Sequence, residues 1–377
     1  MKLLVIDIQK GITDSRLFNF EAFIDDTIRI IKAARDNQIE VIYFQHDDGP
    51  GTGFKLCLGE ALMNIVLNRC IKVIIIIIVI LMLFLAISFI RHKICLSNEK
   101  DLLTPLRELV EVDGHNMSIY VEGEGNHTLV FLSGGGTCSP ILDFKSLYSL
   151  LSDDYRIVVV EKFGYGFSDI VDSDRDIDTV LRQTRTALDK AGINGPYVLC
   201  PHSMSGIEAL YWAQQYPDEV EAIIGLDMAV PEYYEEMKIN IPVMKLGQYA
   251  AALGVTRWIP GISESYAIKY GTLTDNEKDI YRAVFYNRTA TVTMINEAKK
   301  IKENASIVKA YGVPQVPMLL FISNGSGGTS FDEKTWRNIP KEYISKSDNA
   351  IFIELDCPHY VHDYMYEKIC IEIRNFL

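Results

Sequence analysis

The chain has 377 residues, of which 48% are hydrophobic and 10% aromatic, so it can bury a large core and is not a disordered chain. Its formal net charge of −13 argues against nucleic acid as a partner, because the phosphates would be repelled. The seven cysteines form no Cys-x-x-Cys pair and no metal-ligand spacing, so we expect free thiols.

Residues 1–54 predict a small separate unit. Two apolar runs, 2–6 and 41–45, are typical of strands, and residues 20–36 between them are typical of a helix, so we expect a βαβ unit with parallel strands. The run Asp7-Ile8-Gln9 and the strand end at His46 resemble the opening third of the isochorismatase-like cysteine hydrolases. The resemblance implies that Asp7 is a catalytic acid, but no nucleophilic cysteine domain follows. We therefore interpret the unit as a fragment without activity of its own.

Residues 73–90 form the longest apolar run, 18 consecutive uncharged positions between Lys72 and Arg91. As a helix rising 1.5 Å per residue they span about 27 Å, close to the thickness of a bilayer's hydrocarbon core. This predicts one transmembrane helix, with linkers at 55–72 and 91–104. Basic residues are balanced on its two sides, and by analogy with a signal anchor we favour the extracytoplasmic side for the C-terminal domain.

Two strand-and-turn segments open the C-terminal part of the chain. The apolar run 129–132 leads into Ser133-Gly134-Gly135-Gly136, and glycines in such a loop let backbone N–H groups approach a substrate oxyanion. A second apolar run, 155–160, leads into a turn that contains Gly164, Gly166 and Ser168.

The third turn places a serine between an apolar strand and a helix. Residues 196–200 are typical of a strand and residues 206–213 of a helix, with Ser203 between them. The small residues Pro201 and Ser205, two positions either side, allow a sharp turn that exposes the hydroxyl. This pattern predicts a nucleophile elbow; a serine that merely caps the helix is the alternative.

These three turns, each after a strand-like run and in this order, resemble those of the α/β-hydrolase family over residues 105–377. The resemblance implies an α/β fold, a mostly parallel sheet with helices on both faces and a helical cap at about residues 229–312. It also implies that the backbone N–H groups of Gly135 and Met204 form an oxyanion hole. Ser133 departs from the family pattern, which usually has histidine there, as do Pro201 and Ser205, where glycine is usual.

A serine nucleophile needs a histidine to take its proton and an acid to orient that histidine. His359 follows the strand-like run 350–355 near the C-terminus, where the family carries its base, and His362 is the alternative. The usual acid position, after the penultimate strand, contains no carboxylate. We therefore favour Asp227, which follows the preceding strand, with Asp332 as the alternative acid.

Together these features predict a membrane-anchored serine hydrolase that cleaves an ester, thioester or amide bond through an acyl-enzyme intermediate. Its expected partners are a small-molecule or peptide acyl substrate and the membrane, and this mechanism requires no metal or cofactor. An alternative function is a non-catalytic binding or sensory module with the same fold. The missing carboxylate after the penultimate strand keeps that alternative open.

Overall fold

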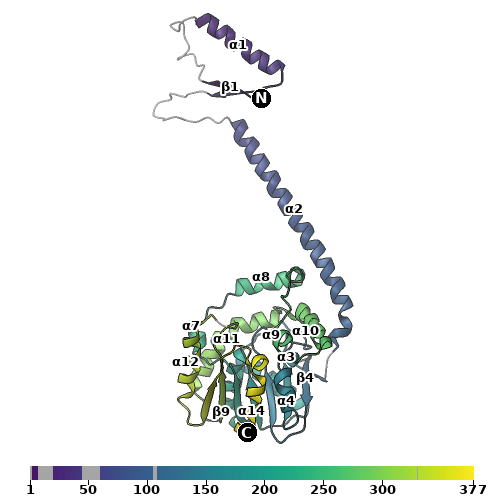
Figure 1. Cartoon of the computed structure of the whole chain (residues 1–377), viewed down its shortest axis with the longest axis vertical. Coiled ribbons are helices and arrows are strands. Elements are labelled where there is room, and N and C mark those ends of the chain that lie inside the picture. The colour runs from purple at the N-terminus through teal and green to yellow at the C-terminus, as the bar shows by residue number, and fades with distance from the viewer. Residues whose placement is uncertain (1, 7–19, 45–59, 105–107, 329) are drawn as a thin grey trace. The chain divides into compact units, whose positions relative to one another are not determined.

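The computed structural model describes residues 2–6, 20–44, 60–104, 108–328 and 330–377 (Figure 1). The chain comprises two compact units, Met1–Phe84 and Leu85–Leu377. Asp7, Gln9 and His46, on which the cysteine-hydrolase resemblance depends, lie outside the described residues.

The first unit begins with two strands and a helix, β1 (Lys2–Ile6), α1 (Phe20–Asp36) and β2 (Glu40–Phe44). The strands pair in parallel, as the sequence predicts, with Lys2 opposite Glu40. A two-stranded sheet buries little apolar surface, and Ile28 and Ile30 of α1 are 45% and 54% exposed. Among the described residues of this unit, no wider sheet covers these side chains.

A single long helix, α2 (Glu60–Asn98), contains the apolar run. Its segment Arg69–Asn98 has a mean hydropathy of 3.6 over its most apolar 18-residue window, and 6% of that window is buried. By length and composition, α2 is the one helix in the described part of the chain that can cross a bilayer.

Eight strands of the second unit form one sheet in the order β10-β9-β8-β7-β5-β6-β4-β3. Strands β5 to β10 run parallel, whereas β4 is antiparallel to β6 and β3 is antiparallel to β4. The predicted mostly parallel sheet is thus confirmed. The strands are β3 (Glu108–Val112), β4 (His115–Glu122), β5 (Thr128–Leu132), β6 (Arg156–Glu161), β7 (Tyr197–Pro201), β8 (Val220–Leu226), β9 (Met318–Ile322) and β10 (Ala350–Glu354).

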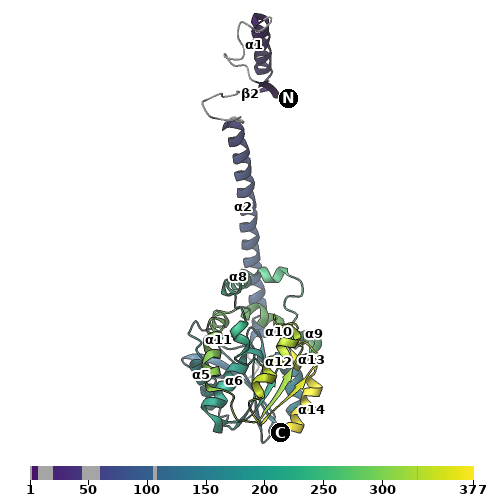
Figure 2. The same cartoon turned by 90° about the vertical axis from the view of Figure 1, so that its left-hand side faces the viewer.

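Helices cover both faces of this sheet (Figure 2). Successive side chains of a strand point to opposite faces, so Val130 and Leu132 of β5 pack in one core and Leu129 and Phe131 in the other. The first core includes α5 (Ile177–Lys190), α6 (Gly206–Gln215) and α12 (Glu333–Ile344), and the second α3 (Pro140–Asp143), α4 (Lys145–Leu151), α13 (Val361–Tyr364) and α14 (Tyr366–Phe376).

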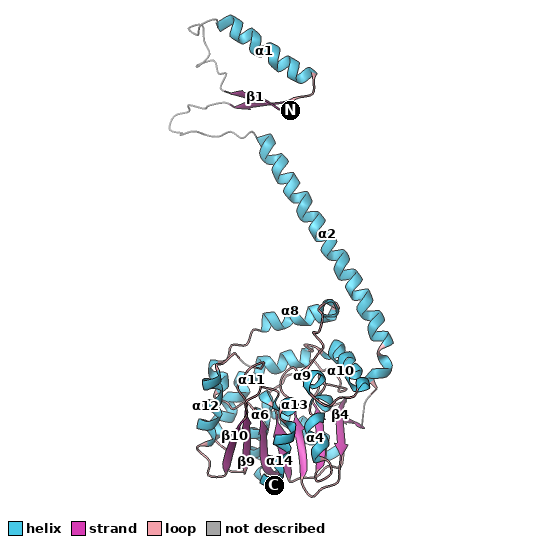
Figure 3. Cartoon of the chain, viewed as in Figure 1, coloured by secondary structure: helices cyan, strands magenta, loops and turns pink. Residues whose placement is uncertain are grey.

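Five further helices lie between β8 and β9 in the chain, within the stretch predicted to form a cap. They gather at one end of the sheet (Figure 3). They are α7 (Tyr233–Glu236), α8 (Ile241–Ala252), α9 (Tyr266–Tyr270), α10 (Asp275–Arg288) and α11 (Val292–Tyr311). Short 3-10 turns complete the unit: η1 (Lys100–Leu103), η2 (Ser203–Ser205), η3 (Pro217–Glu219) and η4 (Val255–Trp258).

A buried charge cluster ties the cap to the sheet. Glu297 of α11 lies 3.5 Å from the Nζ of Lys162 and 3.3 Å from the guanidinium of Arg175, and Tyr165 donates to it at 2.5 Å. Lys162 also lies 3.4 Å from Glu208 of α6. Burial by itself would raise the pKa of Glu297, but Lys162 and Arg175 outweigh it and the net shift is downward. The carboxylate is therefore held in its charged form, which binds α11 to the end of β6.

We expect Glu297→Gln to lower the free energy of unfolding by about 3 kcal/mol, because it leaves Lys162 and Arg175 buried with too little negative charge. Urea unfolding of the full chain in detergent measures the change. Glu303→Gln on the same helix is the matched control, because Glu303 is 61% exposed in its pair with Lys300 and such surface pairs contribute less than about 1 kcal/mol. Equal losses in the two variants would contradict a stabilising role for the cluster.

Candidate active site

Ser203 stands at a strained turn between β7 and α6. Its φ of +53° lies in the left-handed region, which non-glycine residues seldom adopt. The backbone N–H of Ala229 donates to the carbonyl of Ser203 at 2.7 Å and holds this conformation. The serine side chain stays partly exposed. This is the geometry of a nucleophile elbow, which presents the hydroxyl at the end of a sheet.

Two small residues that follow Ser203, Ser205 and Gly206, have a packing reason. The Oγ of Ser205 lies 2.6 Å from the carbonyl of Leu132, so the elbow is tied to the end of β5. A Cβ on Gly206 would collide with the backbone carbonyl of Ala229. Serine at position 205, where the family pattern usually has glycine, therefore fits the turn and adds a hydrogen bond.

His359 and Asp227 form a buried pair. The Nδ1 of His359 lies 2.5 Å from the Oδ2 of Asp227, and each residue is 3% exposed. An ionised carboxylate can only accept a hydrogen bond, so Nδ1 carries the proton and Nε2 is left as the proton acceptor. Asp227 directly follows β8 and, like Ser203, has a positive φ, +48°.

Three donor groups orient the carboxylate of Asp227 besides His359. The backbone N–H and the hydroxyl of Ser323 donate to its two oxygens at 2.7 and 2.6 Å. The indole N–H of Trp336 lies 3.1 and 3.2 Å from the same oxygens. These donors fix the Asp227 carboxylate in the direction of the imidazole.

The alternative residues are engaged elsewhere. Asp332 is exposed at the N-cap of α12, where its carboxylate accepts from the backbone N–H and hydroxyl of Thr335 at 3.0 and 2.7 Å. His362 is fully buried, with its Nε2 3.3 Å from Asp143. Of the candidate pairs, the structure brings together His359 and Asp227.

His202 connects the serine to the histidine. It precedes Ser203 in the chain, and its ring centroid lies 4.6 Å from that of His359. Burial, with the nearby His359 and His362, lowers the pKa of His202 well below its usual range. His202 is therefore a neutral packing residue between the elbow and the His359 loop.

The loop after β5 lies against the elbow. A Cβ on Gly134 would stand 2.8 Å from the Cβ of Ser203, and one on Gly135 would stand 3.1 Å from the methyl carbon of Met204. The glycines thus allow a close approach of the two segments. The residues expected to form an oxyanion hole, Gly135 and Met204, are neighbours, and their catalytic role stays a prediction.

The turn after β9 supports the histidine, a contribution that the sequence pattern did not predict because only a carboxylate was expected there. The N–H of His359 donates to the carbonyl of Ser326 at 2.9 Å, and a Cβ on Gly328 would collide with the imidazole ring. The sequence could have indicated this contact, because Ser323 follows β9 and Asp227 follows β8, and the ends of adjacent parallel strands lie close together.

A second polar cluster lies deep beside this site. One ligand atom each from Asp143, His362 and Asp363 lies within 4.8 Å of the others, so by residue type they can hold a metal ion. The hydroxyl of Tyr281 donates to Asp143 at 3.1 Å. Burial and the charge of Asp143 raise the pKa of Asp363 well above its usual range. Both carboxylate oxygens of Asp363 are buried without a hydrogen-bond partner, and we assign the cluster no catalytic step.

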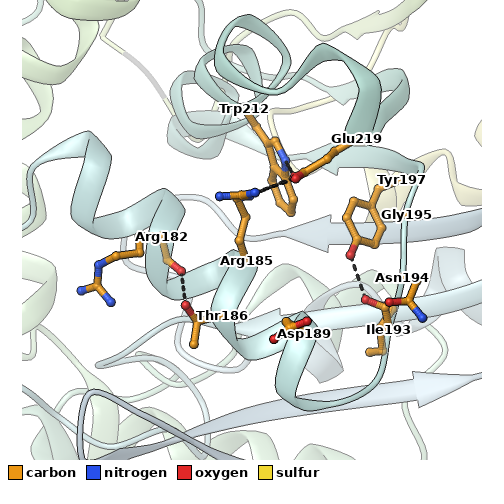
Figure 4. Close-up of a pocket in the computed structure, with 10 residues that line it drawn as sticks. All are labelled: Arg182, Arg185, Thr186, Asp189, Ile193, Asn194, Gly195, Tyr197, Trp212 and Glu219. Atoms are coloured by element: carbon orange, nitrogen blue, oxygen red, sulfur yellow. Dashed lines mark hydrogen bonds and ion pairs between the residues drawn. The ribbon is translucent and has the colours of Figure 1, made fainter.

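A pocket of about 400 Å³ lies elsewhere on the unit (Figure 4). Its lining includes Tyr197, the first residue of β7, whereas Ser203 follows the other end of that strand. Arg185 in this pocket is already paired with Glu219 at 2.5 and 2.9 Å, and Trp212 donates to the same carboxylate at 2.9 Å. Arg182, the other arginine of the lining, is paired with Asp113 at 2.8 and 2.7 Å. The pocket is therefore remote from the Ser203 turn, and both of its arginines already have a carboxylate partner.

Comparison with known proteins identifies the class. Residues 127–363 match the alpha/beta hydrolase fold family. The uncharacterized protein YbdG of Bacillus subtilis is 39% identical over 260 residues, which cover 67% of this chain and 79% of YbdG. The chain therefore belongs to the α/β-hydrolase family.

Solved structures share the fold at low identity. An epoxide hydrolase of Bacillus megaterium has a TM-score of 0.55 at 16% identity and covers 71% of this chain and 99% of its own. A haloalkane dehalogenase of Bradyrhizobium elkani has a TM-score of 0.54 at 17% identity and covers 71% and 96%. These likenesses show the fold alone, and the isochorismatase-like resemblance of residues 1–54 stays a prediction.

We expect Gly328→Ala to loosen the His359–Asp227 pair, because the new methyl group would push the imidazole aside. The far-downfield imidazole Nδ1 proton signal, measured by NMR on the detergent-solubilised chain, should shift or broaden. Gly247→Ala is the control, since a Cβ there meets nothing within 4 Å and the residue lies inside α8. An unchanged signal in Gly328→Ala would show that the turn does not position the histidine.

Proposed function

We propose that this protein is a membrane-anchored serine hydrolase that cleaves an acyl ester, thioester or amide. The observation that carries the proposal is the buried His359–Asp227 pair next to the strained Ser203 elbow. Members of the α/β-hydrolase family are hydrolytic enzymes, which supports a hydrolytic reaction. The fold by itself does not fix the bond that is cleaved, because its relatives include epoxide hydrolases and dehalogenases.

In the proposed mechanism the Oγ of Ser203 attacks the acyl carbon while the Nε2 of His359 takes its proton. Asp227 holds the imidazole and stabilises the imidazolium that forms. The N–H groups of Gly135 and Met204 stabilise the oxyanion of the tetrahedral intermediate. His359 then protonates the leaving group. In the second half of the reaction, His359 takes a proton from water as the water attacks the acyl-enzyme, and it returns that proton to the Oγ of Ser203 as the acid product leaves.

The thiols near the site are poor candidates for the nucleophile. Burial, with some contribution from Asp227 and Asp356, raises the pKa of Cys357 to about 12. Burial likewise raises the pKa of Cys138, beside the glycine loop, to about 12. Because the thiolate is the reactive form, both cysteines are inert near neutral pH. This favours the serine.

We assign the membrane anchor to α2. Its run 73–90 has the length of a single bilayer crossing, and the exposed apolar side chains of Ile74 to Leu83 would be in contact with water in the absence of lipid. The proposed localisation is a single-pass membrane protein with its catalytic domain on the extracytoplasmic side.

A non-catalytic binding or sensory module is the second candidate function. It was kept open by the absence of a carboxylate in the turn after β9. Asp227, which follows β8, supplies a carboxylate in place of one after β9, and Ser323 in the turn after β9 donates two hydrogen bonds to it. We therefore favour catalysis.

We expect Ser203→Ala to abolish labelling by a fluorophosphonate probe and hydrolysis of a short-chain acyl ester, with little change in thermal stability. Removing one partly exposed hydroxyl leaves the turn's backbone hydrogen bond in place. Ser149→Ala, at an exposed position on α4, should label like the unaltered protein. Undiminished ester hydrolysis by Ser203→Ala would contradict the assignment of the nucleophile.

We expect Asp227→Asn to lower the turnover number by about 10⁴, because an amide no longer favours the productive tautomer of His359. Asp332→Asn is the matched control, since asparagine caps a helix as well as aspartate does. It should leave both turnover and stability nearly unchanged. The reverse pattern would transfer the role of the acid to Asp332.

A further inference from the structure

The last turns of α2 pack against the cap. From Leu85 onward, α2 belongs to the hydrolase unit. Ser88 is the one polar residue of the run 73–90 and is 1% exposed. Its hydroxyl donates to the carbonyl of Leu253 at 2.8 Å and accepts from the indole N–H of Trp258 at 3.0 Å. The end of the apolar run is thus joined to the segment that follows α8.

Arg257 makes the same junction rigid. Its Nε donates to the Nδ1 of His92 at 2.9 Å, and its terminal nitrogens form a bidentate pair with Glu99 at 2.8 and 2.6 Å. The guanidinium also stacks 4.0 Å from the ring centre of Tyr286. Bidentate pairs fix orientation as well as distance. These contacts hold the cap against the last turns of α2, next to the end of the apolar run.

The cap exposes an apolar surface on α8 and just after it. Val243, Leu246 and Tyr249, three residues apart along α8, are 60%, 68% and 63% exposed. Trp258 and Ile259, directly after the contact with Ser88, are 46% and 49% exposed. We call these five residues the α8 face. Large apolar side chains exposed together, a tryptophan among them, are typical of surfaces that contact the interfacial layer of a bilayer.

The charges around the α8 face suit an anionic membrane surface. The chain as a whole carries a net charge of −13, yet it has no acidic residue between Glu236 and Glu264. The same interval contains Lys238 and Lys245, and Arg91 and Lys93 follow the apolar run in α2. Basic residues beside a membrane segment are attracted to anionic lipid headgroups.

A pocket of about 420 Å³ lies at the same junction. His92 and Leu96 of α2 line it together with Gln248 and Ala252 of α8 and with Thr289. Its lining mixes apolar and polar side chains, as a ligand with a polar group and an acyl chain requires. The hydroxyl of Thr289 lies 3.9 Å from the Sγ of Cys138, in the segment that continues the glycine loop. The pocket therefore adjoins the segment that leads to the proposed oxyanion hole.

We propose that the α8 face lies in the headgroup layer of the bilayer and that the pocket beside it receives an amphiphilic acyl ester from that layer. The proposal rests on the anchor and the serine nucleophile of the proposed function. We assign the α8 face to lipid because the residues that follow α8 contact Ser88, which belongs to the apolar run.

Fluorescence of the full chain in vesicles of phosphatidylcholine and phosphatidylglycerol tests the position of the α8 face. The polarity-sensitive dye NBD is attached to a cysteine introduced as Leu246→Cys, with Cys57, Cys70 and Cys95 replaced by serine. Ile371→Cys is the matched control, because Ile371 of α14 is 57% exposed and lies outside the cap. We expect blue-shifted emission and quenching by shallow spin-labelled lipids at position 246 and water-like emission at position 371.

The outcomes separate this proposal from the one on which it rests. Protein that floats with the vesicles and labels with fluorophosphonate, yet gives water-like emission at position 246, would overturn the docking of the α8 face alone. Emission that depends on protein density rather than on lipid would assign the face to a second copy of the chain and would also overturn it. Protein that fails to float contradicts the anchor, and loss of probe labelling contradicts the nucleophile.

The substrate class is tested by the ratio of two rates, hydrolysis of a vesicle-borne long-chain acyl ester over hydrolysis of a soluble short-chain ester. In the double variant Leu246→Glu with Tyr249→Glu we expect this ratio to fall about tenfold, because charged side chains resist entry into the interface. Ile371→Glu should leave the ratio unchanged. An unchanged ratio in the double variant, with fluorophosphonate labelling intact, would overturn the proposed entry of substrate from the bilayer.

Discussion

The site depends on one constraint of parallel sheets, that neighbouring strands end at the same edge. Strands β7, β8, β9 and β10 are consecutive neighbours, so the residues after them meet at that edge. Ser203 comes after β7, Asp227 after β8, Ser323 after β9 and His359 after β10. Because β9 lies between β8 and β10, its turn can contact both Asp227 and His359. It donates two hydrogen bonds to Asp227 and accepts one from the N–H of His359.

Two of these residues hold backbone conformations that cost free energy. Ser203 and Asp227 have φ values of +53° and +48°, and such conformations cost about 1–3 kcal/mol each. Backbone hydrogen bonds offset that cost: Ala229 donates to Ser203 at 2.7 Å, and Asp227 donates to Phe321 at 2.9 Å. The positive φ values turn the chain sharply after β7 and β8, at the edge of the sheet where these strands end. The sheet thus fixes the positions of Ser203 and Asp227.

Local signals in the sequence predicted part of this arrangement. The elbow at Ser203, the glycine loop and the long apolar helix each depend on neighbouring residues, so a short window reveals them. The sequence also favoured Asp227 over Asp332, but Asp227 meets His359 because β8, β9 and β10 are neighbours, and no short window of sequence reveals that order. Trp336, which donates to Asp227, reaches it only because α12 packs on the sheet. Contacts of this kind join residues far apart in the chain and leave no periodic pattern in the sequence.

The apolar run shows how one helix meets two environments. A hydroxyl within a bilayer-spanning segment is costly unless it finds a hydrogen-bond partner. Ser88 finds two, in the carbonyl of Leu253 and the indole of Trp258, so the polar residue of the run marks where the helix meets the cap. If the run occupies the bilayer, that contact places the residues after α8 at its surface. An acyl ester held there could then pass from lipid to enzyme while its acyl chain remains shielded from water.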